Sequence, residues 1–98
     1  LTNIIVKMLF EIVTIKEVKL SIGKICREKR EAQKLSRDEL AAALNLSRNT
    51  IQNIEMGKNA NLDNLLKLAY HFDLLNEIHA GLQKIGTKPS GIKIPSLY

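Results

Sequence analysis

The sequence has no tryptophan, only two tyrosines and two phenylalanines, and a single cysteine. With so few aromatic side chains, the core of this 98-residue chain must come from Leu, Ile and Ala, as in a small helical bundle. One cysteine excludes an internal disulfide and fits a reducing compartment. No run of about 18 uncharged apolar residues is present, so no transmembrane helix is expected. We therefore expect a cytoplasmic protein with one folded domain.

The motifs of common enzyme and metal sites are also missing. We find no Gly-rich phosphate loop and no nucleophile motif. Cys26 has no obvious base in its own helix, so a small buried apolar role is expected for it. His71 and His79 are poorly spaced for one metal ion, because Asp73 is expected to end a helix between them. We predict that the protein is not an enzyme and that it holds no metal or cofactor.

Positive charge is in excess, with 15 Lys and Arg against 10 Asp and Glu and a net charge of +5. A basic balance favours an anionic partner, either nucleic acid or a membrane surface. The basic residues of the first predicted helix do not face a large apolar stripe with aromatic anchors, so no membrane binding is expected. Nucleic acid is therefore the favoured partner.

Residues 35–57 (LSRDELAAALNLSRNTIQNIEMG) contain two short helical patterns with a tight break between them. Ser36 and Glu39 form a capping box that begins the first helix. Asn45 tolerates the left-handed conformation that ends a helix, and Ser47 can cap the next one. Two helices joined by about four residues cross steeply instead of packing antiparallel, which predicts a helix-turn-helix.

The second of these helices has a polar face opposite its apolar seam, at about 100° per residue. This face consists of Arg48, Asn49, Gln52, Asn53 and Met56. Asn and Gln can pair bidentately with adenine in a DNA major groove, Arg with guanine, and a Met methyl can touch thymine. An isolated helix of this composition is more often a solvated surface. The preceding helix-turn unit and the basic surroundings favour DNA recognition here.

Taken together, these features resemble the Cro/phage-repressor (XRE-like) helix-turn-helix family over residues 22–75. The matching positions are a small residue at the helix crossing, three core residues and an I-E-x-G ending: Ala41, Leu46, Ile51, Ile54 and residues 54–57. The resemblance implies an all-α, five-helix repressor-like domain. It also implies a sequence-specific repressor that binds double-stranded DNA as a homodimer on a palindromic operator.

The resemblance and the polar face together predict the DNA contacts. The residues expected at base edges are Arg48, Asn49, Gln52 and Asn53. Those expected at phosphates are Ser47, Thr50, Lys58 and Arg37, the last standing where the family commonly has a backbone-contacting Gln. In the family, the Arg at the position of Arg30 pairs with the Glu at the position of Glu55. These two residues are therefore expected to be structural.

The flanking patterns divide the chain into residues 1–13, 14–85 and 86–98. The β-branched residues of 4–13 indicate a short strand, which would pair with a second chain or with the C-terminal tail, or stay alone. From Gly86 onward, Gly and Pro favour an extended tail, either unattached or a docking segment for a partner protein.

Two of the longer helical patterns carry apolar stripes. The stripe expected to face the core from the first helix is Val18, Ile22, Ile25 and Ala32. The stripe expected from the fourth helix is Leu62, Leu65, Leu66, Ala69 and Phe72.

The last predicted helix, residues 74–84, adds a further apolar seam that is either plain core or a dimer interface: Leu75, Ile78, Leu82 and Ile85. Residues 74–78 also resemble antitoxins of the HipB type, which repress their own operon and bind a kinase toxin. The alternative function is therefore an antitoxin or regulatory subunit that mainly binds a partner protein.

Overall fold

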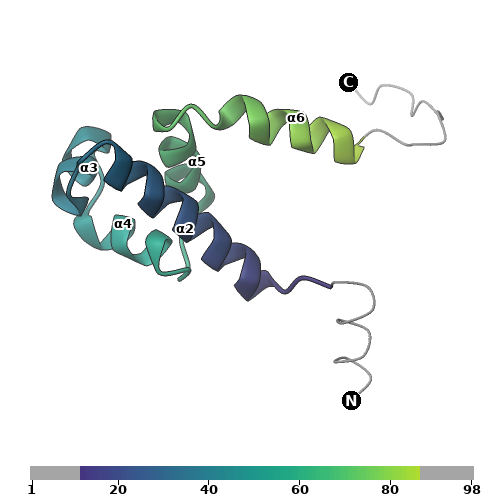
Figure 1. Ribbon diagram of the computed structural model, residues 1–98, viewed down its shortest axis with the longest axis horizontal. Coiled ribbons are helices and arrows are strands. Elements are labelled where there is room, and N and C mark those ends of the chain that lie inside the picture. The colour runs from purple at the N-terminus through teal and green to yellow at the C-terminus, as the bar shows by residue number, and fades with distance from the viewer. Residues whose placement is uncertain (1–11, 87–98) are drawn as a thin grey trace, which may run out of the picture.

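The structure is a computed structural model that describes residues 12–86. Figure 1 shows its five helices: α2 (Ile15–Ala32), α3 (Arg37–Leu44), α4 (Arg48–Glu55), α5 (Leu62–His71) and α6 (Leu75–Gly86). Residues 12–86 contain no strand, so the predicted all-α, five-helix fold is confirmed. The strand predicted at 4–13 lies outside the described residues except for positions 12 and 13. The predicted tail lies outside them beyond Gly86.

Local capping explains where the helices begin. The side chains of Thr14, Ser36, Ser47 and Asn61 each accept a hydrogen bond from the backbone N–H three residues later. Ser36 completes its predicted box, because the Glu39 carboxylate accepts from the Ser36 N–H at 2.8 Å. Such caps satisfy N–H groups that have no partner inside the helix.

Left-handed residues mark where three of the helical segments end. Asn45, with φ 56°, ends α3 as predicted. Lys34, with φ 60°, follows the end of α2, and Asp73, with φ 58°, follows the end of α5. A left-handed conformation costs an L-residue about 1–2 kcal/mol, which the surrounding fold must offset.

The core lies where α2, α3, α4 and α5 meet. Its buried members are Cys26, Leu40, Ala41, Ile51, Ile54, Leu68 and Phe72. Burial, helped by the negative charge of Glu55, raises the pKa of the Cys26 thiol to about 11. The thiol therefore stays protonated at neutral pH, in line with the small apolar role expected for it.

Of the four residues predicted on the core face of α2, only Ile22 packs against the core. Val18 and Ile25 are 48% and 46% exposed, and Ala32 is also exposed. The buried residues of α2 are instead Gly23, Cys26 and Arg30. A Cβ at Gly23 would lie 2.5 Å from the backbone oxygen of Glu55, so only glycine lets α2 approach α4 this closely. The packed face of α2 is thus set by a glycine contact and a buried arginine, which an apolar pattern does not reveal.

The predicted stripe of α5 is partly correct. Ala69 and Phe72 are buried, as is Leu68, which the pattern omitted. Leu62 is 68% exposed, so the first turn of α5 faces away from the core. Leu65, also in the predicted stripe, is half-buried and packs against the core, so the packed face begins one turn into this helix.

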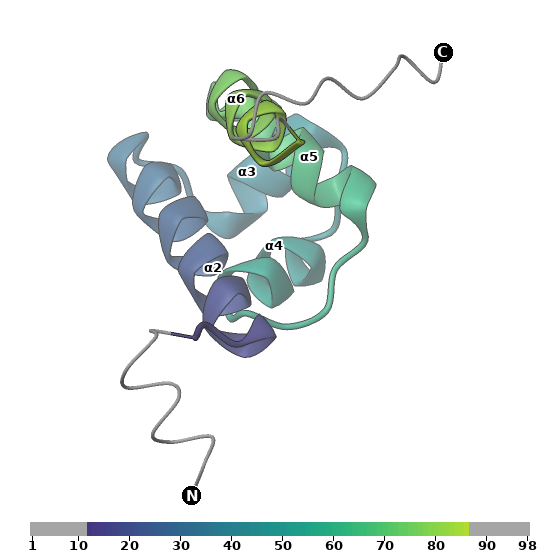
Figure 2. The same cartoon turned by 90° about the vertical axis from the view of Figure 1, so that its right-hand side faces the viewer.

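The last helix, α6, runs away from the other helices in Figure 1, and in Figure 2 it is seen end on, apart from α4. None of its residues is buried, and Leu74, just before it, is the point that packs against the core. The domain therefore presents α4 and α6 as two separate surfaces. Among the described residues, no helix is both long and apolar enough to cross a membrane.

Candidate nucleic-acid interface

The connection between α3 and α4 is short and fixed at both ends. Asn45 reverses the chain, and the backbone N–H of Leu46 donates to the Ala41 carbonyl at 2.8 Å. Ser47 then caps α4 through the Thr50 N–H at 3.1 Å. Ile51 and Ile54 are buried beneath α4, which fixes the rotation of this helix about its axis. Packing of the buried face therefore holds the opposite face of α4 outward. This orientation does not depend on the side chains of the outward face.

A buried carboxylate ties three helices together behind this face. Glu55 has a side chain that is 1% exposed, and it accepts from Arg30 Nε at 2.6 Å and from Arg37 Nε at 3.0 Å. Arg30 also donates from Nη2 to Glu55 at 3.1 Å and from Nη1 to the Leu35 carbonyl at 2.9 Å. The expected Arg30–Glu55 pair is thus confirmed, and Arg37 joins it.

These contacts set the protonation state of the network. Burial alone raises the pKa of Glu55, but the hydrogen bonds from Arg30 and Arg37 outweigh it and leave that pKa below its ordinary value. The hydrogen bond to Glu55 in turn raises the pKa of Arg30. Glu55 is therefore ionised at neutral pH, and the network consists of one anion between two cations.

The residues predicted at base edges share the outward side of α4. Arg48 and Asn49 are exposed, whereas Gln52 and Asn53 are half-buried. Arg48 Nη1 donates to Gln52 Oε1 at 2.8 Å, and Gln52 Nε2 donates to the Met56 sulfur at 3.7 Å. The face is thus an ordered row of polar groups along the helix, with Met56 at its far end.

The residues predicted at phosphates lie around this row in three places. The hydroxyls of Ser47 and Thr50 are 2.9 Å apart at the start of α4. Lys58 is exposed after the end of α4, where its backbone N–H donates to the Asn53 carbonyl at 2.8 Å. Arg37 stands at the start of α3, with its Nε used by Glu55 and its side chain 25% exposed. Its role at a phosphate stays a prediction.

One charged neighbour of the polar row on α4 was not predicted from the sequence. Asp38, in the first turn of α3, places Oδ1 3.5 Å from Arg48 Nε. The contact joins two helices, so neither helix pattern alone indicates it. The sequence signal was only an acidic residue in a first turn, where acids commonly stabilise the helix dipole.

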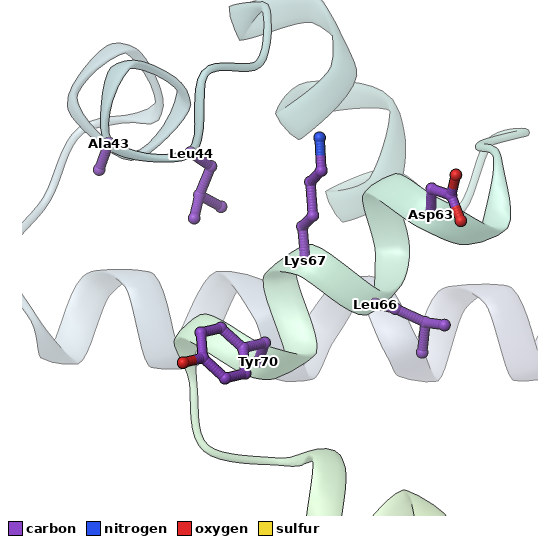
Figure 3. Close-up of a pocket in the computed structure, with 6 residues that line it drawn as sticks. All are labelled: Ala43, Leu44, Asp63, Leu66, Lys67 and Tyr70. Atoms are coloured by element: carbon purple, nitrogen blue, oxygen red, sulfur yellow. The ribbon is translucent and has the colours of Figure 1, made fainter.

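A separate groove lies between α3 and α5, shown in Figure 3. Its lining residues are Ala43, Leu44, Asp63, Leu66, Lys67 and Tyr70. Tyr70 is 72% exposed, so its ring is offered to solvent. None of the lining residues belongs to α4. In the part of the chain that the structure describes, no group of three or more His, Cys, Asp and Glu residues is placed to hold a metal ion.

Comparison with known proteins finds one family. Residues 27–74 match a family model described as helix-turn-helix. A comparison with curated proteins finds no match. The matched stretch begins within α2, contains α3, α4 and α5, and ends just before α6. It therefore includes all the residues predicted to contact DNA.

Proposed function

Because the chain belongs to the helix-turn-helix family of the Cro/phage-repressor (XRE) type, whose members are DNA-binding regulators, we propose that it is a sequence-specific repressor. It binds double-stranded DNA as a homodimer, on a palindromic operator with half-sites about 34 Å apart. The observation that carries this proposal is the polar row on α4, held outward by the buried Ile51 and Ile54 beneath it. This family supports a regulatory role in preference to a catalytic one.

In this proposal α4 lies in the major groove and α3 crosses the sugar–phosphate backbone above it. Arg48, Asn49, Gln52 and Asn53 reach base edges, because Arg matches guanine and the amides match adenine or isolated acceptors. Ser47, Thr50, Lys58 and Arg37 bind phosphates around them. The net charge of +5 draws the protein to DNA of any sequence, and the row on α4 then discriminates between sequences.

Alanine substitutions separate base readers from phosphate binders. We expect Gln52→Ala to weaken operator binding by about 1–3 kcal/mol and to relax discrimination at one operator position. We expect Lys58→Ala to weaken binding to all sequences alike and to flatten the salt dependence by about one unit. Titrations of the selected operator and its point variants at several salt concentrations measure both effects. A Gln52→Ala protein with unchanged operator preference would refute the placement of α4 in the groove.

A second candidate function is that of an antitoxin or regulatory subunit that mainly binds a partner protein. The observation that favours it is the groove between α3 and α5, whose lining includes Leu66 and Tyr70; Tyr70 is 72% exposed, and Leu62, two turns before it on α5, is 68% exposed. Large apolar side chains gathered on one surface often mark a protein interface. This surface does not use α4, so partner binding and DNA binding are compatible in one molecule.

Tyr70→Glu tests this second function. The side chain is exposed, so the substitution should leave folding and operator binding almost unchanged. If a protein encoded by a neighbouring gene copurifies with the wild type, Tyr70→Glu should abolish that association. Deletion of residues 87–98 tests in the same assay whether the predicted tail takes part. A partner that binds both variants as tightly as the wild type would place its interface elsewhere.

A further inference from the structure

The Arg48 side chain is held from two sides at the start of α4. Its Nε lies 3.5 Å from Asp38 Oδ1 on α3, and its Nη1 donates to Gln52 Oε1 one turn along α4 at 2.8 Å. Arginine side chains on a surface usually sample many rotamers. Here an ion pair to α3 and a hydrogen bond along α4 restrict the guanidinium group, although the side chain is still 51% exposed.

Most of the N–H donors of Arg48 remain available for another acceptor. A guanidinium group carries five N–H donors. Nε faces Asp38 in an ion pair at 3.5 Å and one N–H of Nη1 is donated to Gln52, so both N–H groups of Nη2 and the second of Nη1 remain for another acceptor. The O6 and N7 atoms of guanine are two adjacent acceptors that match such a fork. An anchored Arg48 is therefore suited to a base edge.

The same contacts orient the Gln52 side chain. Its Oε1 accepts from Arg48 and keeps a second lone pair, so it can accept from only one further donor, such as an adenine amino group. The amide nitrogen remains a donor, with the Met56 sulfur as its neighbour at 3.7 Å. The donors of Arg48 and the Gln52 amide nitrogen thus lie beside one another, which suits a base edge rich in acceptors, such as that of guanine.

We propose that Asp38 is a positioning residue that sets DNA discrimination by holding the donors of Arg48, beside Gln52, toward a guanine edge. This inference rests on the proposed function. Without Asp38, Arg48 is able to turn toward the nearest phosphate, which any sequence supplies. The Asp38 carboxylate, in a side chain that is 75% exposed, also repels phosphates near α3 and so weakens non-specific binding.

Asp38→Asn tests the proposal because it keeps the side-chain shape and removes the charge. The probes are a duplex that the wild type selects from a random library and a scrambled duplex of the same composition. We expect Asp38→Asn to reduce the affinity ratio between them by about five- to tenfold, mainly by tightening binding to the scrambled duplex. The salt dependence on the scrambled duplex should steepen by about one unit as Arg48 gains a phosphate.

Two further variants isolate the mechanism. Glu28→Gln removes one negative charge from the exposed surface of α2, so it should tighten both duplexes slightly and leave the affinity ratio unchanged. In an Arg48→Gln background, Asp38→Asn should no longer alter the ratio, because the residue that Asp38 holds is gone. Hydrogen exchange at Arg48 Nε, followed by NMR without DNA, should become faster in Asp38→Asn.

The possible failures are distinguishable. If Asp38→Asn tightens both duplexes equally, as Glu28→Gln does, Asp38 acts only as a surface charge and the proposal is wrong. Unchanged exchange at Arg48 Nε would also overturn it, without any reference to DNA. A wild-type protein that selects no sequence at all would overturn both this inference and the proposed function.

Discussion

Glu55→Ala is expected to lower the free energy of unfolding by about 3–5 kcal/mol, because it leaves two buried or half-buried arginines without their anion. Arg30 and Arg37 both direct Nε at this carboxylate, and their side chains are 11% and 25% exposed. Domains of this kind have only about 5–15 kcal/mol of total stability. The variant should therefore be close to unfolding at room temperature, as measured by urea denaturation followed by circular dichroism.

An exposed ion pair on α2, the helix that carries Arg30, provides the control. Arg27 and Glu31 lie 3.3 Å apart on α2, with side chains 59% and 54% exposed. A solvent-exposed pair contributes at most about 1 kcal/mol, so Glu31→Ala should change stability little. If Glu55→Ala is no more destabilising than Glu31→Ala, the buried network does not hold α2, α3 and α4 together.

The Glu55 contribution should also depend on pH in a defined direction. The pKa of Glu55 in the folded protein is lower than its ordinary value of 4.5, since the hydrogen bonds from Arg30 and Arg37 outweigh burial. A lowered pKa stabilises the fold above the unfolded pKa and loses that contribution as pH falls through the folded pKa. The stability difference between wild type and Glu55→Gln should be constant near neutral pH and shrink below about pH 4.5.

Another carboxylate also has a lowered pKa. The backbone N–H of Ser36 lowers the pKa of Glu39, which is fully exposed. Glu39 is present in both proteins, so its effect cancels in the difference between them. A difference that grows on acidification would contradict the assignment of Glu55 as a stabilised anion.

The parts of this fold that the sequence predicts are those that depend on neighbours along the chain. The caps at Ser36 and Ser47 and the left-handed turn at Asn45 each follow from a residue's own preferences and from groups within a few positions. The alternation of apolar and polar residues on α4 likewise fixes which of its faces is buried. The helices, the turn between α3 and α4 and the outward polar row on α4 can therefore be predicted from the sequence alone.

The parts that the sequence misses depend on how helices cross. The packed face of α2 is determined by Gly23, whose missing Cβ lets the Ile54 and Glu55 carbonyls approach. A pattern of apolar residues gives no weight to glycine. The Arg30–Glu55 pair spans 25 residues and was expected only through the family resemblance. Glu55 pairs with Arg37, and Asp38 pairs with Arg48. Both ion pairs join α3 to α4, so predicting them requires the angle at which these helices cross.

The structure also decides one alternative that the sequence left open, because the α6 seam is not core within the described chain. Leu75, Ile78, Leu82 and Ile85 are 36%, 39%, 59% and 81% exposed. The ionised groups on α6 are Glu77 and Lys84, whose charges cancel. Two chains of net charge +5 repel each other, but a neutral apolar helix is where that repulsion is weakest. We propose that a second copy of the chain covers this seam.

Disrupting the α6 seam should therefore strongly weaken binding to the palindromic operator. It should not change binding to a duplex that contains only one half-site. We expect Leu82→Glu to convert the dimer to a monomer and to weaken binding to a palindromic duplex by about 10²–10⁴-fold, because the second half-site is then no longer bound intramolecularly. Binding to a duplex with one half-site should stay the same, since α4 is untouched. Sedimentation across a range of concentrations and titration of the two duplexes measure these effects.

Asn76→Glu is the matched control, because it places the same charge on the side of α6 away from the seam, at another exposed position. It should leave both the dimer and the palindrome affinity unchanged. A helix of 12 residues is only about 18 Å long, so the two-helix contact buries less than a standard interface of about 1,600 Å². The dimer should accordingly be weak in solution and be completed on DNA, where the palindrome holds both copies in place. Equal losses on the palindrome and the half-site in Leu82→Glu, or a dimer that survives the substitution, would show that α6 is not the contact between copies.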